Sequence, residues 1–410
     1  MKFISKLKSS KKIERVSYFS LVFFVFLYIF AVPSFGSRSG LSYSVYLIFA
    51  ILTGLVAFYF LLFKKITFNR YLLFVPLFIA YSLLGTLLFS HQLRGWLTLF
   101  LLGTSFFVLY YAFQIIEHKF IVLSIIVFGI FAYSLYYIFH YRSEIIHFSS
   151  FGSEAFRLGD YFDNQNDVAA CCLAGFSLSI YLLLFSKKLF KLIFIFPSMS
   201  IFLVGLTTGS RTFILASVLI FLVFLYFRMR NHKLLYLISL IVVIGLLFVF
   251  INLPFMATIK ERLLKMVRTF FTSSNTVDTS AVSRSIWLDY GVFLGSKHII
   301  FGLGYGGFSI FSGVGTFTHS NMVEVFCDFG LPGLLLFYSP YFALVCLQIK
   351  NRDRLLQLTL PLFVLYFAIS FSMVFFYNKM YYLIIALLSF ISISSKEKDI
   401  SGVFSRVLGS

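Results

Sequence analysis

Charged residues are scarce in this chain of 410 residues: they make up 12%, where soluble domains carry roughly 25%. Hydrophobic residues reach 60%. A soluble protein of this length needs polar side chains to cover its surface, so the composition excludes a soluble enzyme and a disordered chain. Only four cysteines occur, all in or beside apolar stretches, which excludes a disulfide scaffold. The composition predicts an all-α polytopic membrane protein.

Motifs for metal and nucleotide binding are also missing. The sequence contains no Asp-x-Asp pair, no His-x-x-x-His pair and no cysteine cluster, so it predicts no metal and no other cofactor. The glycine-rich run Gly302–Gly307 lacks the strand-and-helix setting of a nucleotide-binding loop, and we interpret it as a tight turn. No nucleotide-sugar domain is predicted either.

Long apolar runs dominate what is present. A helix needs about 20 apolar residues to cross the hydrocarbon core of a membrane. We predict about 12 transmembrane helices within one integral membrane domain, 1–410. The stretches are Val16–Val32, Leu41–Phe63, Tyr71–Phe89, Trp96–Ile116, Phe120–Phe139, Val168–Phe185, Leu189–Leu206, Thr212–Phe227, Leu234–Ile251, Met322–Leu347, Leu355–Phe375 and Tyr381–Ile393.

The formal net charge of +19 is explained by topology. With both termini in the cytoplasm, 22 of the 34 Lys and Arg residues fall on the inner side, which then carries +17 against +2 outside. The basic excess is therefore an orientation signal, and no nucleic-acid partner is expected. The first apolar run is long and lacks a convincing cleavage site, so we interpret it as a retained helix.

The connection at residues 252–321 is the longest, and on this topology it forms a large periplasmic or extracellular loop. Its segment Met256–Phe271 has apolar residues at helical spacing with basic residues between them. This pattern is typical of an interfacial amphipathic helix on lipid headgroups, and equally of a helix packed on the bundle with a solvated basic face. The basic side chains are Lys260, Arg262, Lys265 and Arg268.

Several short motifs on the outer side follow one another in a fixed order. They are GSRT at 209–212, SRSIW at 283–287, the glycine run GLGYGGF at 302–308 and THSN at 318–321, continued by EVFCDFGLPG at 324–333. Each has a plain alternative interpretation, such as a snorkelling arginine, a hydrogen-bonded histidine or a kink at the glycines and Pro332. Together with Asp163–Asp167, which opens the sixth helix, this ordered set resembles the O-antigen polymerase and O-antigen ligase superfamily.

The resemblance implies an inverting, metal-independent membrane glycosyltransferase. Its donor is a glycan on undecaprenyl diphosphate, its acceptor is a glycan hydroxyl, and it acts at the outer face of a bacterial plasma (inner) membrane. Membrane lipids are expected partners, and a chain-length regulator is a further candidate partner. Relatives commonly have adjacent His and Asn residues, whereas Ser320 separates His319 from Asn321 here.

The resemblance also suggests roles for residues. We expect Arg211 and Arg284 to clamp the departing diphosphate, because preorganised cations stabilise charge that grows in the transition state and arginine binds phosphate as a fork. His319 has an ordinary pKa near neutrality, which suits a general base; alternatively it orients the acceptor or donates to the diphosphate.

Other side chains are candidates for substrate binding. Glu324 and Asp328, four residues apart on one helix face, either orient His319 or bind sugar hydroxyls. The remaining candidates are Lys260, Arg262, Lys265, Arg268, Asn166 and Tyr305.

Three functions stay open. A polymerase joins one lipid-linked repeat unit to another, and we favour it. A ligase transfers the finished chain to lipid A core or another acceptor by the same donor chemistry. A flippase or other transporter is a third class, disfavoured because transporters place binding charges near the midplane and show internal repeats, which this chain lacks.

Overall fold

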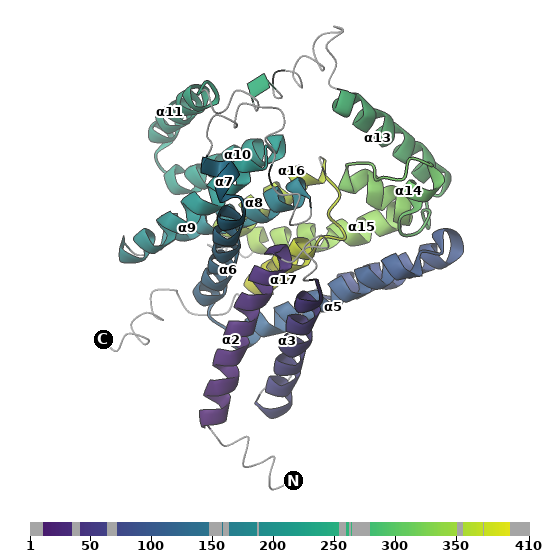
Figure 1. Cartoon of the computed structure of the whole chain (residues 1–410), viewed down its shortest axis with the longest axis horizontal. Helices are drawn as coiled ribbons and strands as arrows, with labels where there is room; N and C mark the ends of the chain where they lie inside the picture. The colour runs from purple at the N-terminus through teal and green to yellow at the C-terminus, as the bar shows by residue number, and fades with distance from the viewer. Residues whose placement is uncertain are drawn as a thin grey trace.

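The computed structural model describes residues 11–34, 42–63, 72–146, 158, 164–186, 188–253, 260, 261, 264, 279–350, 356–371 and 373–393. All regular structure in these residues is helical. The all-α class predicted from composition is therefore confirmed for the described part of the chain (Figure 1).

Each of the apolar stretches predicted from the sequence coincides with a helix. These helices are α2 (Lys11–Ser34), α3 (Ser42–Leu62), α4 (Phe74–Gly85) with the π-helical η2 (Thr86–Ser90), α5 (Leu93–Ile116), α6 (Lys119–His140), α8 (Gln165–Phe185), α9 (Lys188–Thr207), α10 (Arg211–Met229), α11 (Lys233–Ile251), α15 (Asn321–Lys350), α16 (Leu356–Ser370) and α17 (Lys379–Ile393).

Eight helices in the described residues are long and apolar enough to cross a membrane: α2, α3, α5, α6, α8, α9, α10 and α15. Four shorter apolar helices lie at Phe74–Ser90, Lys233–Gly245, Gln357–Phe367 and Lys379–Ser392. A multi-pass membrane protein follows from these lengths and compositions. The total of 12 spans and the cytoplasmic termini stay predictions.

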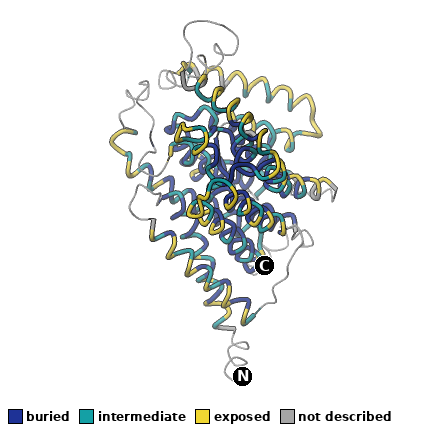
Figure 2. Tube along the Cα trace, turned by 90° about the vertical axis from the view of Figure 1, so that its right-hand side faces the viewer, coloured by how far each residue is buried: buried dark blue, intermediate teal, exposed yellow. Residues whose placement is uncertain are grey.

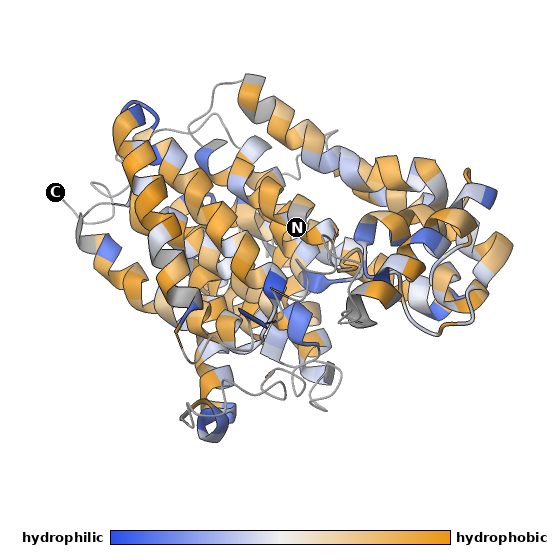
Figure 3. Ribbon diagram, turned by 90° about the horizontal axis from the view of Figure 1, so that it is seen from above, coloured by the Kyte–Doolittle hydropathy of each residue, from blue (hydrophilic) through white to orange (hydrophobic). Residues whose placement is uncertain are grey.

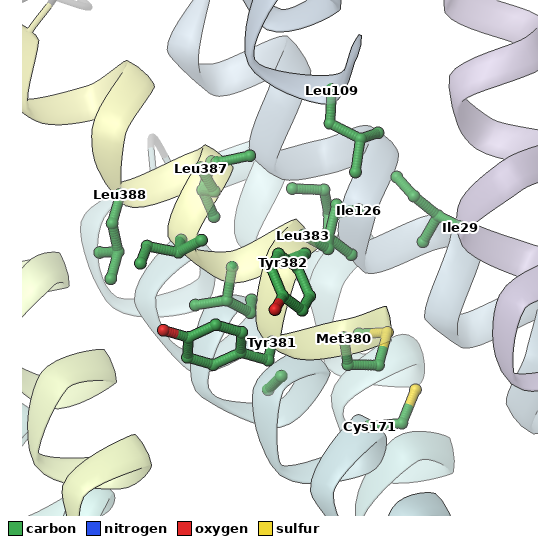
Figure 4. Close-up of a cluster of buried hydrophobic side chains, with 14 of the residues drawn as sticks. Ile29, Leu109, Ile126, Cys171, Met380, Tyr381, Tyr382, Leu383, Leu387 and Leu388 are labelled. Carbon is green, nitrogen blue, oxygen red and sulfur yellow. The ribbon is translucent and has the colours of Figure 1, made fainter. Parts of the chain in front are cut away.

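The centre of the molecule is built around α17. Its side chains from Met380 to Leu388 are buried, and Figure 4 shows several of them in a cluster that also includes Ile29 of α2, Leu109 of α5 and Ile126 of α6. The buried hydroxyl of Tyr382 donates to the carbonyl of Phe376, at 3.0 Å. A helix that is apolar on every side suits this central position, because it has no face for water.

The periphery is apolar as well. Figure 2 shows burial concentrated in the middle of the bundle, and Figure 3 shows hydrophobic residues continuing to the outer helix surfaces. Leu61, Leu234 and Phe248 are large hydrophobic side chains that are strongly exposed. Exposed apolar surface on this scale fits a lipid environment.

The predicted large outer loop contains two helices, α13 (Thr279–Lys297) and α14 (Gly307–Phe311). We call residues 279–320 the α13–α14 lobe; Figure 1 shows it at one edge of the molecule beside α15. The predicted amphipathic helix Met256–Phe271 falls almost wholly outside the described residues: only Lys260, Glu261 and Leu264 are described, each in helical conformation. A short helix, α7 (Arg142–Ile146), lies in the connection between α6 and α8.

A kink divides α15, as the glycines and proline of its sequence predict. Gly330 has non-helical angles, φ 66° and ψ −173°. The next amide, that of Leu331, donates to the carbonyl of Ile299 at 2.7 Å. A Cβ at position 330 would lie 2.3 Å from the carbonyl oxygen of Ile300, so only glycine allows the lobe to approach α15 this closely.

Candidate functional site

Small residues on α13 bring the lobe against the first turns of α15. A Cβ on Gly291 would lie 2.7 Å from side-chain atoms of both Thr318 and Val323, and one on Gly295 would lie 2.7 Å from the ring of Phe326. The two helices therefore pack with their backbones close together. This packing places the SRSIW motif of α13 beside the THSN motif that precedes α15.

Three predicted motif residues meet at this junction. Arg284 and Trp287 are one helical turn apart on α13, so they share a face. The indole ring of Trp287 stacks on the imidazole ring of His319, with centroids 5.3 Å apart and planes 18° apart. The Phe317 ring meets the same imidazole edge-on at 4.6 Å. We call Arg284, Trp287 and His319 the candidate cluster.

The backbone of His319 has a left-handed conformation, with φ 62°. Residues other than glycine adopt this region rarely, and it persists only where the surroundings fix it. The ring contacts with Trp287 and Phe317 supply such surroundings. The imidazole is thus held in one place at the junction between α13 and α15.

Burial, and then the nearby Arg284 cation, lower the pKa of His319 from its usual 6.5 to about 4. This differs from the near-neutral pKa that the sequence argument assumed. A pKa near 4 leaves the imidazole neutral at pH 7, and a neutral imidazole has one nitrogen that accepts a hydrogen bond or a proton. Because Arg284 contributes to this lowering of the pKa, the two side chains lie close enough to interact electrostatically.

Glu324 supports the segment that carries His319. Its carboxylate oxygen Oε2 accepts the amide hydrogen of Thr318 at 2.7 Å, and the side chain is almost fully buried. The hydroxyl of Thr318 donates to the carbonyl of Ser320 at 3.0 Å. Of the two roles predicted for Glu324, orienting His319 is the one that these contacts favour.

Asn321 joins distant parts of the chain. Its side-chain oxygen accepts the amide hydrogens of Phe375 and Phe376, at 2.9 and 2.8 Å, and its amide nitrogen donates to the hydroxyl of Tyr338 at 2.9 Å. The side chain is fully buried. Asn321 therefore fixes the connection between α16 and α17 to the start of α15.

Asp328 holds the glycine run. Its two carboxylate oxygens accept the amide hydrogens of Gly306 and Phe308, at 2.9 and 3.1 Å, and its backbone carbonyl accepts that of Gly304 at 2.7 Å. The side chain is fully buried. These bonds bear out the interpretation of Gly302–Gly307 as a tight turn, and they join the Asp328 carboxylate to that turn.

Tyr305 lies inside the same turn, packed against α5 and the α16–α17 connection. A Cβ on Gly95 would lie 2.3 Å from its ring, and its ring meets that of Phe376 edge-on at 5.8 Å. Its amide donates to the hydroxyl of Thr86 at 3.1 Å. Burial, followed by the carboxylates of Asp328 and Glu324, raises the pKa of Tyr305 to about 12, so the phenol keeps its proton.

Arg211 is the first residue of α10 and is half-buried. The preceding Ser210 caps the helix, its hydroxyl accepting the amide hydrogen of Phe213 at 3.4 Å. A cation at the positive end of a helix dipole is unfavourable on its own, whereas an anion bound there meets both the helix and the guanidinium. Arg211 thus lies at the positive end of α10, on a different helix from Arg284.

The start of α8 is tied to the same connection that Asn321 fixes. Asn164 caps α8 by accepting the amide hydrogen of Asn166 at 3.0 Å, which places Asn166 in the first turn, half-buried. The carboxylate of Asp167 accepts a hydrogen bond from Asn378 at 2.7 Å. Asp167 belongs to the motif Asp163–Asp167, whereas Asn378 was not singled out in the sequence, and the order of motifs carried no signal for their pairing.

The basic group of the loop is only partly described. Lys260 donates to the side-chain oxygen of Asn252 at 2.6 Å. Arg262, Lys265 and Arg268 lie outside the described residues. Among the residues that the structure describes, no group of three His, Cys, Asp or Glu side chains is placed to hold a metal ion.

Comparison with known proteins identifies one region. Residues 196–338 match the model of a family described as O-antigen ligase. This segment begins in α9 and ends in α15, so it contains Arg211, the whole α13–α14 lobe and the first half of α15. A comparison with curated proteins finds no match.

Proposed function

We propose that this chain is a membrane glycosyltransferase that elongates a bacterial polysaccharide, because residues 196–338 match the O-antigen ligase family model and the ordered motifs resemble the O-antigen ligase and polymerase superfamily. Glycan transfer in polysaccharide synthesis is the activity that this match suggests. The finer assignment is a polymerase, which transfers a glycan from polyprenyl diphosphate to a hydroxyl of another lipid-linked repeat unit. The alternative within the superfamily is a ligase that uses lipid A core or another acceptor.

The candidate cluster is the observation that carries the proposal. It combines the guanidinium of Arg284, on the face of α13 that meets α15, with the fixed neutral imidazole of His319, which lies just before α15. The reaction needs these two groups: a cation where the diphosphate leaves, and a proton acceptor where the sugar hydroxyl attacks. Arg211 at the start of α10 is the second cation that we assign to the diphosphate.

In the proposed step the acceptor oxygen attacks the anomeric carbon, on the face opposite the diphosphate. The new carbon–oxygen bond forms as the bond between that carbon and the phosphate oxygen breaks, and the configuration inverts. The hydroxyl proton passes to the neutral imidazole of His319. The departing diphosphate carries the bonding electrons away as negative charge, which Arg284 and Arg211 stabilise.

The surrounding residues are assigned to support and binding. Glu324 acts on His319 through Thr318, and Asp328 acts on the glycine turn, so we propose both as positioning residues. Asn166, Tyr305, Lys260, Arg262, Lys265 and Arg268 remain proposed contacts for the glycan or the diphosphate. The enzyme would work in the bacterial inner membrane with its site facing the periplasm or cell exterior.

The assay that tests the function uses purified protein in lipid vesicles. A polyprenyl-diphosphate-linked repeat unit is supplied alone, or together with a lipid A core acceptor, and products are separated by size. Polymer without the core acceptor is the expected result. Transfer only to the core acceptor would replace the polymerase with a ligase, and no glycan product in either arm would reject glycan transfer and favour transport.

Matched variants make the assignment of residues specific. Arg284→Ala and His319→Ala are expected to abolish product while the protein stays at its normal level in the membrane. Arg94 of α5 and His298 of the lobe lie outside the candidate cluster, so Arg94→Ala and His298→Ala serve as controls and should leave product formation intact. Equal activity in all four variants would overturn the proposed site.

A further inference from the structure

The helix α13 has two opposite faces. Successive residues turn by about 100° around a helix, so Arg284 and Phe293, nine residues apart, point in opposite directions. One face carries Arg284, Trp287, Gly291 and Gly295 and meets the THSN segment and α15. The candidate cluster therefore occupies only one side of this helix.

The opposite face is apolar and exposed over the length of the helix. We call it the α13 stripe; its members, with their exposed fractions, are Val282 at 38%, Ile286 at 60%, Tyr290 at 37% and Phe293 at 49%. The rings of Tyr290 and Phe293 stack with centroids 6.1 Å apart. Four apolar side chains in a row at helical spacing form a continuous surface that water solvates poorly.

The stripe continues onto the surface of the apolar helices. After α13 the chain turns through Ile299 and Ile300, and Ile300 is 62% exposed. The carbonyl of Ile299 accepts the amide hydrogen of Leu331 in α15, and the carbonyl of Ile300 accepts the hydroxyl hydrogen of Tyr81 in α4. Leu84 of α4 and Leu331 and Leu335 of α15 are themselves exposed, so the apolar surface passes from the lobe onto two bundle helices.

The backbone amides of the turn at residues 302–308 make all their hydrogen bonds within the protein. Non-helical backbone tolerates an apolar medium only where its polar groups are paired inside the protein. Every amide from 302 to 308 has a partner: Gly302 with the carbonyl of His298, Leu303 with that of Cys327, Gly304 with that of Asp328, Tyr305 with the hydroxyl of Thr86, Gly307 with the carbonyl of Gly304, and Gly306 and Phe308 with the Asp328 carboxylate.

The charged side chains beside the stripe, Lys297 and Asp289, lie at its edges. The ammonium group of Lys297 lies 4.1 Å from the ring centroid of Phe293, so its aliphatic stem runs along the stripe. Lysines at membrane boundaries behave in this way, with the stem on apolar surface and the ammonium group among lipid phosphates. Asp289 lies about 40° around the helix from Phe293 and marks another edge of the apolar surface.

We propose that the α13 stripe, together with Ile300, is a lipid-facing surface that holds the α13–α14 lobe in the membrane leaflet on the side where α15 begins. Its partner is the boundary between acyl chains and headgroups of the bilayer. The lobe is then attached to the bilayer along one side of α13, while its other exposed positions face water. Arg284, on the other side of the same helix, and His319, which packs against that side, are thereby kept at the level of lipid phosphates.

Spin labels at paired positions test this surface. Single cysteines replace Ile286 and Phe293 in the stripe, and their matched controls are Ser285→Cys and Ser296→Cys, which are exposed positions on another side of α13. The parent chain carries Cys346→Ala, because Cys346 is the exposed native cysteine in the described residues, and unlabelled parent serves as blank. Collisions of the labels with oxygen, which concentrates in lipid, and with a water-soluble nickel chelate are measured in vesicles.

We expect the collisions of the labels to depend on their position around α13. Labels at 286 and 293 should collide often with oxygen and lose their collisions with nickel, whereas labels at 285 and 296 should collide with nickel. Strong nickel collisions at 286 and 293 would place the stripe in water and overturn the proposal. Low collisions with both reagents at 286 and 293 would mean that protein covers the stripe, which would also overturn the proposal. None of these outcomes depends on whether the protein transfers glycans.

Discussion

His319 differs from an ordinary loop histidine in three ways. Its ring is stacked on Trp287, its backbone is left-handed, and the residue before it is bonded to the buried Glu324. Each restraint reduces the positions open to the imidazole. A proton acceptor that is fixed before the substrate arrives loses little entropy when the reaction begins. The geometry around His319 therefore matters as much to the proposed chemistry as its identity.

The pKa of His319 gives a prediction for the pH dependence of transfer. The neutral imidazole is the active form, and with a pKa of about 4 it persists until the pH falls to that region. Replacing Arg284 by Gln removes the cation that opposes protonation, so the pKa of His319 should rise towards 6.5. The acidic limb of kcat/KM should therefore move to higher pH in Arg284→Gln, and the maximal rate should fall roughly 10²–10³-fold through loss of a charged donor.

The control for this prediction is Arg94→Gln, which removes an exposed cation at the start of α5. Its pH profile should match that of the parent protein. An unchanged acidic limb in Arg284→Gln would show that this arginine does not control the protonation of the catalytic base.

Glu324 offers a second prediction at this scale. If it acts by accepting the Thr318 amide hydrogen, Glu324→Gln keeps an acceptor oxygen and should retain most activity. Glu324→Leu leaves that buried amide without a partner, at a cost of about 1–3 kcal/mol, and should lower kcat and thermal stability more than it raises KM. A large rise in KM in Glu324→Gln would instead indicate direct binding of a sugar hydroxyl.

At the residue scale the sequence allowed part of the candidate site to be predicted. Arg284 and His319 were predicted together because their motifs occur in a recognisable order, and the structure places them in one cluster. The supporting bonds were not predictable. Asn321 pairs with residues 54 and 55 positions away, and Asp167 pairs with a residue 211 positions away, distances at which a single sequence gives no sign of contact.

At the scale of elements, the glycine turn of the lobe depends on two different requirements. Gly302 and Gly306 share a positive φ, 65° and 67°. A Cβ on Gly302 would lie 2.4 Å from backbone atoms of Asp328 and Phe329, whereas one on Gly306 would have no atom within 4 Å. Backbone strain applies to both positions, and steric conflict applies only to the first.

These facts predict unequal effects of alanine. Gly306→Ala should lower the free energy of unfolding by about 1–2 kcal/mol, because a residue with a Cβ is strained in a left-handed conformation. Gly302→Ala should lower the free energy of unfolding by about 1–3 kcal/mol more than Gly306→Ala, because the added Cβ forces the lobe away from α15. The thermal unfolding midpoint of the solubilised protein measures the difference, and equal midpoints would contradict the tight contact at Gly302.

Elements were largely predictable from the sequence because the chain's apolar runs are long. All the apolar stretches coincide with helices, and the kink at Gly330 follows from the glycines and proline there. The helix α13 was not predicted. Its segment contains serines, Arg284 and Asp289 among the apolar residues, and its packing on α15 relies on Gly291 and Gly295, which are poor helix formers in isolation.

At the scale of the whole molecule, the inside–outside arrangement is a prediction from charge alone. The connection between α10 and α11, with Arg228, Arg230 and Lys233, belongs to the basic side, and the lobe belongs to the other side. Positive residues remain on the cytoplasmic side during insertion. The proposed function requires this arrangement, because it places glycan transfer at the outer face of the membrane.

Labelling of single cysteines in intact cells tests the arrangement. Asn231→Cys lies in the exposed turn between α10 and α11, and Val314→Cys lies in an exposed part of the lobe. A maleimide that cannot cross membranes should label position 314 in intact cells and position 231 only after the cells are opened. Labelling of both positions after opening is the control for accessibility. The reverse pattern would place Arg284 and His319 on the cytoplasmic side, where the proposed donor chemistry does not occur, and would reject the orientation and the function together.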